Sequence, residues 1–179
     1  LAKMEATALL WVLFLCGIHT TTGTATIAYG PVGLSRPTGV VVDSVSDSLF
    51  IVDNNNSRVL RFANRNLLTP TRIPDCIFGQ IGTMQQASAF GFAFPTAACV
   101  DANGTLFVSD TGNNRIMVFP QASSAFSGAA ASEVLGQVNF TFAVANQGLS
   151  NPNPATLNQP RGLSCSSDDL WVADSANNR

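Results

Sequence analysis

The sequence has 179 residues, of which 46% are hydrophobic and only 11% are charged, and its formal net charge is −2. This length corresponds to about one domain, with enough apolar residues to form a substantial core. The low charge, without any run of Lys or Arg, excludes the electrostatic surface that nucleic acids or anionic membranes require.

Residues 1–25 are expected to form a secretory signal peptide. Lys3 precedes a mostly apolar run from Ala6 to Ile18, and small polar residues follow this run. Its length fits the apolar region of a signal peptide, about 7–15 residues, and is below the roughly 20 residues that span a bilayer. Two alternatives stay open, an uncleaved membrane anchor and a buried segment of the domain. The expected location is therefore extracellular, or outside the cell on a membrane anchor.

The first of three similar units opens near Pro37. Short apolar, β-branched runs alternate with turn-forming residues, and no helical period is present. The runs predict four strands, at residues 37–43, 49–52, 58–62 and 76–80.

The second unit opens near Pro95 and the third near Pro160, so the opening prolines recur about every 60 residues. The predicted strands of the second unit are residues 95–101, 106–109, 115–119 and 134–137. The third unit has predicted strands at 160–166 and 170–172, and the sequence stops in its second turn, at Arg179. The additional length of the second unit falls in residues 138–159, which are rich in Asn and predict a surface loop.

Four-stranded units repeated in this way predict an all-β protein, a β-propeller whose blades are four-stranded sheets arranged around an axis. A β-sandwich gives no reason for one turn motif to recur in register, and solenoids have much shorter periods. Residues 26–179 are therefore expected to be a propeller of about two and a half blades, an incomplete part of a larger one.

The repeated motif resembles the NHL repeat. Each unit contains an opening run such as Pro-Thr-Gly-Val-Val-Val-Asp (residues 37–43), followed by a run such as Leu-Phe-Val-Ser-Asp-Thr-Gly-Asn-Asn-Arg (residues 106–115). A Gly-Gln pair also recurs, at residues 79–80 and 136–137. Departures are small: Ala97 replaces the opening glycine of the second unit, and Cys165-Ser166 replaces Val-Asp in the third. The resemblance implies propellers of about six blades, hence a fragment of a longer protein.

Each unit contains an Asp followed three residues later by Asn and five residues later by Arg. The Asp can accept hydrogen bonds from turn N–H groups, the Asn tolerates the left-handed backbone of tight turns, and the Arg can pair with the Asp or with a neighbouring blade. A catalytic site occurs once in a protein, whereas these residues occur once in each unit, so we interpret them as structural. The set is Asp53, Asn56, Arg58, Asp110, Asn113, Arg115, Asp174, Asn177 and Arg179.

The apolar and aromatic residues predict core positions. The pairs at residues 49–50, 106–107 and 170–171 are expected between sheets. The alternating Phe90, Phe92 and Phe94 are expected to pack under a loop, with stacking on a ligand near the axis as the alternative.

The remaining candidate sites concern modification. Cys76, Cys99 and Cys165 allow one disulfide or three free thiols, and Cys16 lies within the expected signal peptide. Three sequons place possible N-glycosylation at Asn55, Asn103 and Asn139, provided that the chain enters a eukaryotic secretory pathway.

The function expected from the sequence is a secreted or cell-surface scaffold that binds a protein or a glycan, without nucleic acid and without a cofactor. The resemblance also implies two alternatives, a metal-dependent lyase, lactonase or hydrolase and the extracellular sensor domain of a larger membrane protein. The sequence contains no catalytic motif or metal cluster. Its one histidine, His19, lies in the expected signal peptide.

Overall fold

The structure is a computed structural model that describes residues 18–19, 26–27, 33–68, 73–79 and 87–179. Regular structure within these ranges consists of β-strands and short 3-10 helices. No helix in this described part is long and apolar enough to cross a membrane. The expected signal peptide lies outside the described residues, except for β1 (Ile18–His19), which pairs with β2 (Thr26–Ile27).

The units form antiparallel sheets whose strands follow one another in chain order. The first sheet contains β3 (Pro37–Val42), β4 (Leu49–Asp53), β5 (Arg58–Phe62) and β6 (Cys76–Gly79). The second contains β7 (Ala98–Val100), β8 (Leu106–Asp110), β9 (Arg115–Phe119) and β10 (Glu133–Leu135). The third contains β11 (Pro160–Cys165) and β12 (Leu170–Asp174).

A 3-10 helix follows the second strand of every unit, namely η1 (Asn54–Asn56), η3 (Thr111–Asn113) and η6 (Ser175–Asn177). The other 3-10 helices are η2 (Arg65–Leu67), η4 (Ala122–Ser124) and η5 (Ala145–Gly148). Every strand predicted from the sequence is present. The one clear difference is β7, which begins at Ala98 rather than at Pro95. The opening strands of the other two units are irregular at the same point, with register shifts after Pro37 and after Pro160.

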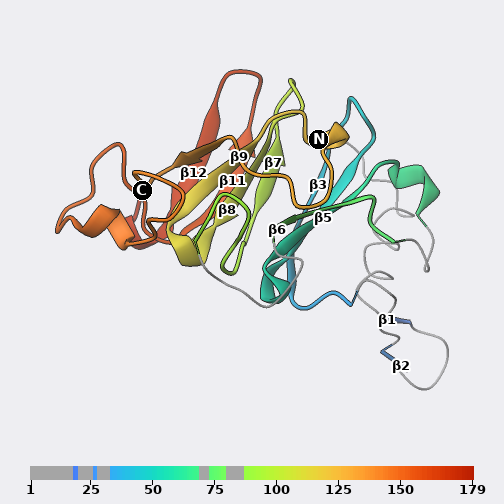
Figure 1. The fold of residues 1–179 in the computed structure, drawn as a ribbon, viewed down its shortest axis with the longest axis horizontal. Helices are drawn as coiled ribbons and strands as arrows, with labels where there is room; N and C mark the ends of the chain where they lie inside the picture. The colour runs from blue at the N-terminus through green and yellow to red at the C-terminus, as the bar shows by residue number, and fades with distance from the viewer. Residues whose placement is uncertain (1–17, 20–25, 28–32, 69–72, 80–86) are drawn as a thin grey trace.

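The opening strands β3, β7 and β11 lie against one another, and the sheets succeed one another across the molecule in chain order (Figure 1). This arrangement, with the first strand of each four-stranded sheet innermost, is that of β-propeller blades. The fold is therefore all-β, part of a propeller built from four-stranded blades.

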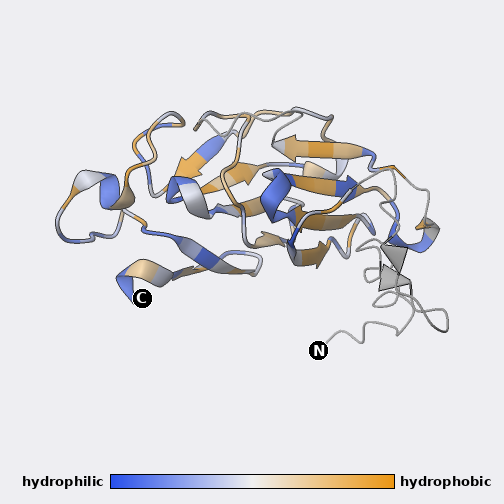
Figure 2. Ribbon diagram, turned by 90° about the horizontal axis from the view of Figure 1, so that it is seen from below, coloured by the Kyte–Doolittle hydropathy of each residue, from blue (hydrophilic) through white to orange (hydrophobic). Residues whose placement is uncertain are grey.

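The main core lies between the first two sheets. Phe50 and Phe78 of the first sheet meet Leu106 and Phe119 of the second, and the ring centroids of Phe78 and Phe119 are 5.0 Å apart. In Figure 2 the strands are mainly hydrophobic and the turns mainly hydrophilic. The apolar faces of neighbouring sheets thus hold the units together.

The predicted aromatic core positions differ in their exposure. Phe50 is fully buried, Phe107 is half-buried, and Trp171 is 69% exposed. The prediction is wrong for Trp171, because no further sheet covers this face of β11 and β12 within the described residues. Phe92 is buried and packs against Phe119 of β9. Phe90 and Phe94 are exposed, so the expectation that they pack under a loop is wrong for these two residues.

The recurring glycine of the outer strand has a packing role. Gly79 and Gly136 both have positive φ angles, +84° and +89°. Phe92 lies directly over Gly79, and Leu157 lies over Gly136, where a Cβ would be 2.6 Å from the leucine side chain. Phe92 and Leu157 each stand three residues before the proline that opens the next unit. Each glycine therefore leaves space for a side chain from the segment that connects its blade to the next one.

Candidate functional site

The three Asp-Asn-Arg sets have the same geometry. In each, one carboxylate oxygen of Asp (Oδ2) accepts hydrogen bonds from the Asn side chain and from the Arg Nε. The Arg Nε to Asp Oδ2 distances are 2.8 Å in the first unit, 2.7 Å in the second and 2.8 Å in the third. The Asn amide bonds to the same oxygen are 2.9, 2.8 and 2.7 Å long. Asp53 lies directly opposite Arg58 across the hairpin, and Asp110 lies opposite Arg115.

The other carboxylate oxygen binds a backbone N–H that the sequence did not indicate. Asp53 Oδ1 accepts from Ser35 N, Asp110 Oδ1 from Ala93 N, and Asp174 Oδ1 from Asn158 N. We had expected these donors to lie in the turn. They lie instead before the opening proline of each unit. The Asp therefore fixes the segment that enters the blade as well as the hairpin.

The left-handed residue of each turn is also displaced from its expected place. The backbone adopts φ near +55° at Ser57, Asn114 and Asn178, one position after the repeated Asn. The repeated Asn instead ends a 3-10 helix and uses its side chain to bind Asp. The expectation that it occupies the left-handed position was wrong, because its amide is engaged with the carboxylate.

The set in the second unit is the most buried of the three. The side chain of Arg115 is fully buried, compared with 21% exposure for Arg58 and 40% for Arg179. The Arg115 guanidinium also donates to the backbone carbonyls of Ser88, Gly91 and Phe140. Burial raises the pKa of the Asp110 carboxyl, and the Arg115 charge and the Ala93 N–H partly oppose this rise. This ion pair is thus a structural element without access to solvent.

One exposed residue in each unit is held in a fixed, strained conformation. Arg36, Phe94 and Gln159 each have φ of +49°, and each precedes the opening proline. The residue before each of them makes two backbone hydrogen bonds. Its N–H donates to the Asp carboxylate, and its carbonyl accepts from a backbone N–H of the 3-10 helix. Non-glycine residues at positive φ are uncommon, and such strain often accompanies function. Sequence reasoning missed these three residues, although their place before the opening proline marks them.

Neighbouring units are joined by the opening prolines. Asn54 Nδ2 donates to the Pro95 carbonyl over 2.8 Å, and Thr111 Oγ1 donates to the Pro160 carbonyl over 2.6 Å. Both donors directly follow the repeated Asp. The strained residues, one position before these prolines, therefore lie at the same end of successive sheets, beside one another.

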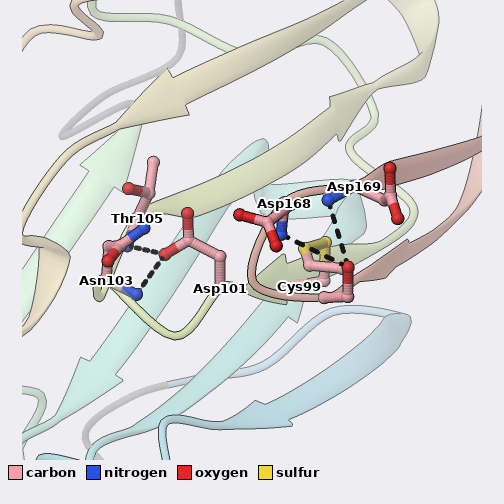
Figure 3. The surroundings of a disulfide bond; sticks show 8 residues. Cys99, Asp101, Asn103, Thr105, Asp168 and Asp169 are labelled. Carbon is pink, nitrogen blue, oxygen red and sulfur yellow. Dashed lines mark hydrogen bonds between the residues drawn. A yellow bond between two sulfur atoms is a disulfide. The ribbon is translucent and has the colours of Figure 1, made fainter.

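The second and third units are also joined covalently. Cys99 on β7 and Cys165 on β11 form a disulfide (Figure 3), while Cys76 is buried and free. Burial is the main reason that the pKa of the Cys76 thiol is raised. The spacing of the cysteines left this pairing open.

The opposite end of the sheets contains the turns between first and second strands. Asp43 accepts hydrogen bonds in the first turn and Asp101 in the second, where the donors are Asn103 N and Thr105 N (Figure 3). In the third turn Ser166 Oγ accepts from Asp169 N over 3.0 Å, so serine replaces aspartate in this role. A groove of about 400 Å³ lies beside the first two turns.

The three sequon asparagines, Asn55, Asn103 and Asn139, are all exposed. In the described ranges, no cluster of three or more His, Cys, Asp or Glu side chains could hold a metal ion. The chain thus presents exposed residues at both ends of its sheets, and the Asp-Asn-Arg sets lie at the end that carries the opening prolines.

Comparison with known proteins agrees with the repeated architecture. The family described as NHL repeat matches residues 34–62 and 92–119. No curated protein matches the chain.

Several solved structures are similar. They include a nidogen/laminin complex (20% identity, TM-score 0.39, covering 57% of this chain and 30% of that chain). A luciferin-regenerating enzyme has 12% identity and a TM-score of 0.48, with 78% and 38% covered. A streptogramin B lyase has 16% identity and a TM-score of 0.43, with 77% and 34% covered. The chain thus spans between 30% and 38% of the length of these proteins.

Proposed function

We propose that this chain, a member of the NHL-repeat family, is a secreted or cell-surface scaffold that binds a protein or glycan partner. The binding surface is the end of the sheets that carries Arg36, Phe94 and Gln159. These residues share one backbone conformation and are all exposed. Their side chains, a cation, an aromatic ring and an amide, have nothing in common.

This combination of a constant backbone and unrelated side chains is the observation that carries the proposal. If the three positions served the fold alone, glycine would relieve the strain that all three residues bear. Instead each position offers a different type of contact, at neighbouring places along one surface. Propeller sheets pack about 10 Å apart, so a partner touching two units needs to extend only a short distance.

Export from the cell is supported by the disulfide and by the apolar N-terminal run. Disulfides persist in oxidising compartments and are rare in the cytosol, and Cys99–Cys165 connects two units. A scaffold is favoured over an enzyme because the three repeated Asp carboxylates are buried and fully engaged in hydrogen bonds. A buried, engaged carboxylate is a poor general base for an external substrate.

The test compares the full chain with a variant in which all three strained residues are glycine (Arg36→Gly, Phe94→Gly and Gln159→Gly). Glycine adopts positive φ freely, so the change removes the side chains and keeps the backbone. Binders are selected for the unmodified chain from a random peptide library and from a glycan array. We expect the triple variant to bind them at least tenfold more weakly.

The matched control replaces two exposed residues elsewhere, Phe126→Ala and Val138→Ala, which are 75% and 64% exposed in the unmodified chain. This control should bind the selected ligands unchanged. The assignment of this surface would be wrong if the triple glycine variant bound as tightly as the unmodified chain. It would also be wrong if the control lost as much binding as the triple variant. Retention of the full chain inside eukaryotic cells would contradict export.

A further inference from the structure

The groove beside the first two turns is built from two units. Its walls come from the turn after β3, from the turn after β7 and from the segment after β9. The lining residues are Asp43, Val45, Ser46, Ala102, Asn103, Gly104, Gln121, Ser123 and Ser124. Its volume of about 400 Å³ falls within the range of small-ligand sites, about 300–1,000 Å³. It lies at the end of the sheets opposite to the proposed partner surface, because β3 runs from Pro37 at one end to this turn at the other.

Asn103 lies in the turn after β7, on the wall of this groove. Asp101 Oδ1 accepts hydrogen bonds from Asn103 N and Thr105 N, at 2.9 and 2.8 Å, and so fixes the backbone of the turn (Figure 3). The Asn103 side chain is exposed. The next residue, Gly104, has open space where a Cβ would stand. Asn103 is thus accessible to modification on an exposed turn.

The groove offers contacts suited to an amphipathic ligand. The side chains of Gln121 and Ser123 have no hydrogen-bond partner within the described part of the chain. Val45, on the opposite turn, is 79% exposed and contributes apolar surface. An N-acetylated sugar needs both: its hydroxyl and amide groups need hydrogen-bond partners, and its methyl and ring C–H groups need apolar contact.

We propose that Asn103 carries an N-linked glycan and that the first N-acetylglucosamine of this glycan lies in the groove between the two units. The inference rests on the proposed export of the chain, since only exported chains receive this modification. The sugar would bridge the two blades and add to their stability. It would also leave the opposite end, with Arg36 and Phe94, free for a partner.

The two other sequons provide matched controls because neither asparagine lines the groove. Asn55 lies in η1 at the other end of the sheet, and the hydroxyl of its sequon, Ser57, is buried. Asn139 lies in the loop after β10, where its Oδ1 accepts from Thr141 N and Phe142 N. Glycans at these positions would project into solvent without a protein contact that adds stability.

The test uses the full chain secreted from eukaryotic cells, with mass spectrometry of the glycopeptides and thermal melting. One sample is trimmed by an endoglycosidase that leaves the first sugar, and another by a peptide N-glycosidase that removes it. We expect Asn103 to be occupied. Trimming to one sugar should leave the melting temperature unchanged, and complete removal should lower it by about 2–4 °C, as the loss of roughly 1 kcal/mol does in a chain of this size. Asn103→Gln should have the same effect as complete removal, unlike Asn55→Gln and Asn139→Gln.

An unmodified Asn103 in the secreted chain would overturn the inference, as would equal melting temperatures of the two trimmed samples. If the full chain is not exported, the proposed function fails on that point, and the glycan is then tested by placing the full chain behind an unrelated signal peptide. In that experiment an occupied Asn103 with the same difference in melting temperature supports the inference. Absence of either result overturns it.

Discussion

At the scale of single residues, the repeated Asp connects three parts of its unit through its two carboxylate oxygens. The pairing of Asp with Arg could be predicted, because the two residues recur at a spacing that places them opposite each other across a hairpin. The bond from Asp110 to Ala93 N could not, since nothing in the local sequence marks a backbone N–H 17 residues away as the partner. The residue with the left-handed backbone was predicted one position too early for a related reason. Turn propensity identifies the repeated Asn, but it does not show that the side-chain amide of this Asn binds the Asp.

Ser57 is the residue whose replacement should stabilise the fold. It is buried, has φ of +53°, and its hydroxyl has no hydrogen-bond partner within the described residues. A left-handed backbone costs a non-glycine residue about 1–2 kcal/mol, and a buried orphan hydroxyl adds a further desolvation cost. Ser57→Gly should therefore raise the free energy of unfolding by about 1 kcal/mol after the greater chain entropy of glycine is subtracted.

Urea unfolding measures this change, and Ser57→Ala is its control. Alanine removes the hydroxyl and keeps the Cβ, so its gain should be smaller than that of glycine. A glycine variant that unfolds at lower urea concentration than the unmodified chain would show that the Ser57 hydroxyl makes a stabilising contact.

At the scale of elements, the strands were predictable and their contacts were less so. Apolar runs separated by turn residues indicated all ten strands of the three units, because a short β-rich run between turn residues has few other folded states. The repeated glycine of the outer strand was visible in the sequence, but its reason was not. The side chain that packs on Gly79 comes from Phe92, in the segment that leads to the next unit.

This contact predicts that Gly79→Ala destabilises the protein strongly. A Cβ at this position would contact the Phe92 ring and stand 2.8 Å from the Ser57 carbonyl oxygen, at a φ of +84°. The left-handed backbone costs about 1–2 kcal/mol and the overpacking about 1–3 kcal/mol more. We expect the free energy of unfolding to fall by at least about 2 kcal/mol.

Gly104→Ala separates the two causes. Gly104 has a similar φ, +77°, but open space around the position of a Cβ. Its replacement should cost only the backbone term, about 1–2 kcal/mol. Equal losses for the two variants in urea unfolding would mean that the packing of Phe92 on Gly79 contributes nothing.

At the scale of the whole molecule, three copies of one framework are joined in series. The period of the sequence was enough to predict the propeller architecture, because repeated four-stranded units have few ways to bury both faces. The links between units were not predictable. Three cysteines allow three pairings, and the hydrogen bonds from Asn54 and Thr111 to the opening prolines depend on how the sheets pack. The exposure of Trp171 likewise depends on what covers β12, and the sequence around Trp171 does not indicate whether this strand is covered.

The central claim is that the Asp-Asn-Arg sets hold the blades and that binding is left to other residues. Urea unfolding of Asp53→Ala, Asp110→Ala and Asp174→Ala tests this most directly. Removing one partner of a buried ion pair costs about 3–5 kcal/mol, and the cost falls as the remaining Arg becomes more exposed. The losses should therefore follow the burial of the Arg, largest for Asp110, intermediate for Asp53 and smallest for Asp174.

If Asp110→Ala does not fold, Asp110→Asn replaces it in the series, since the amide oxygen can still accept from Ala93 N. The central claim predicts a loss of stability in all three units, and any loss of ligand binding should accompany that loss of stability. A variant that unfolds at the same urea concentration as the unmodified chain, but no longer binds its selected ligand, would contradict it.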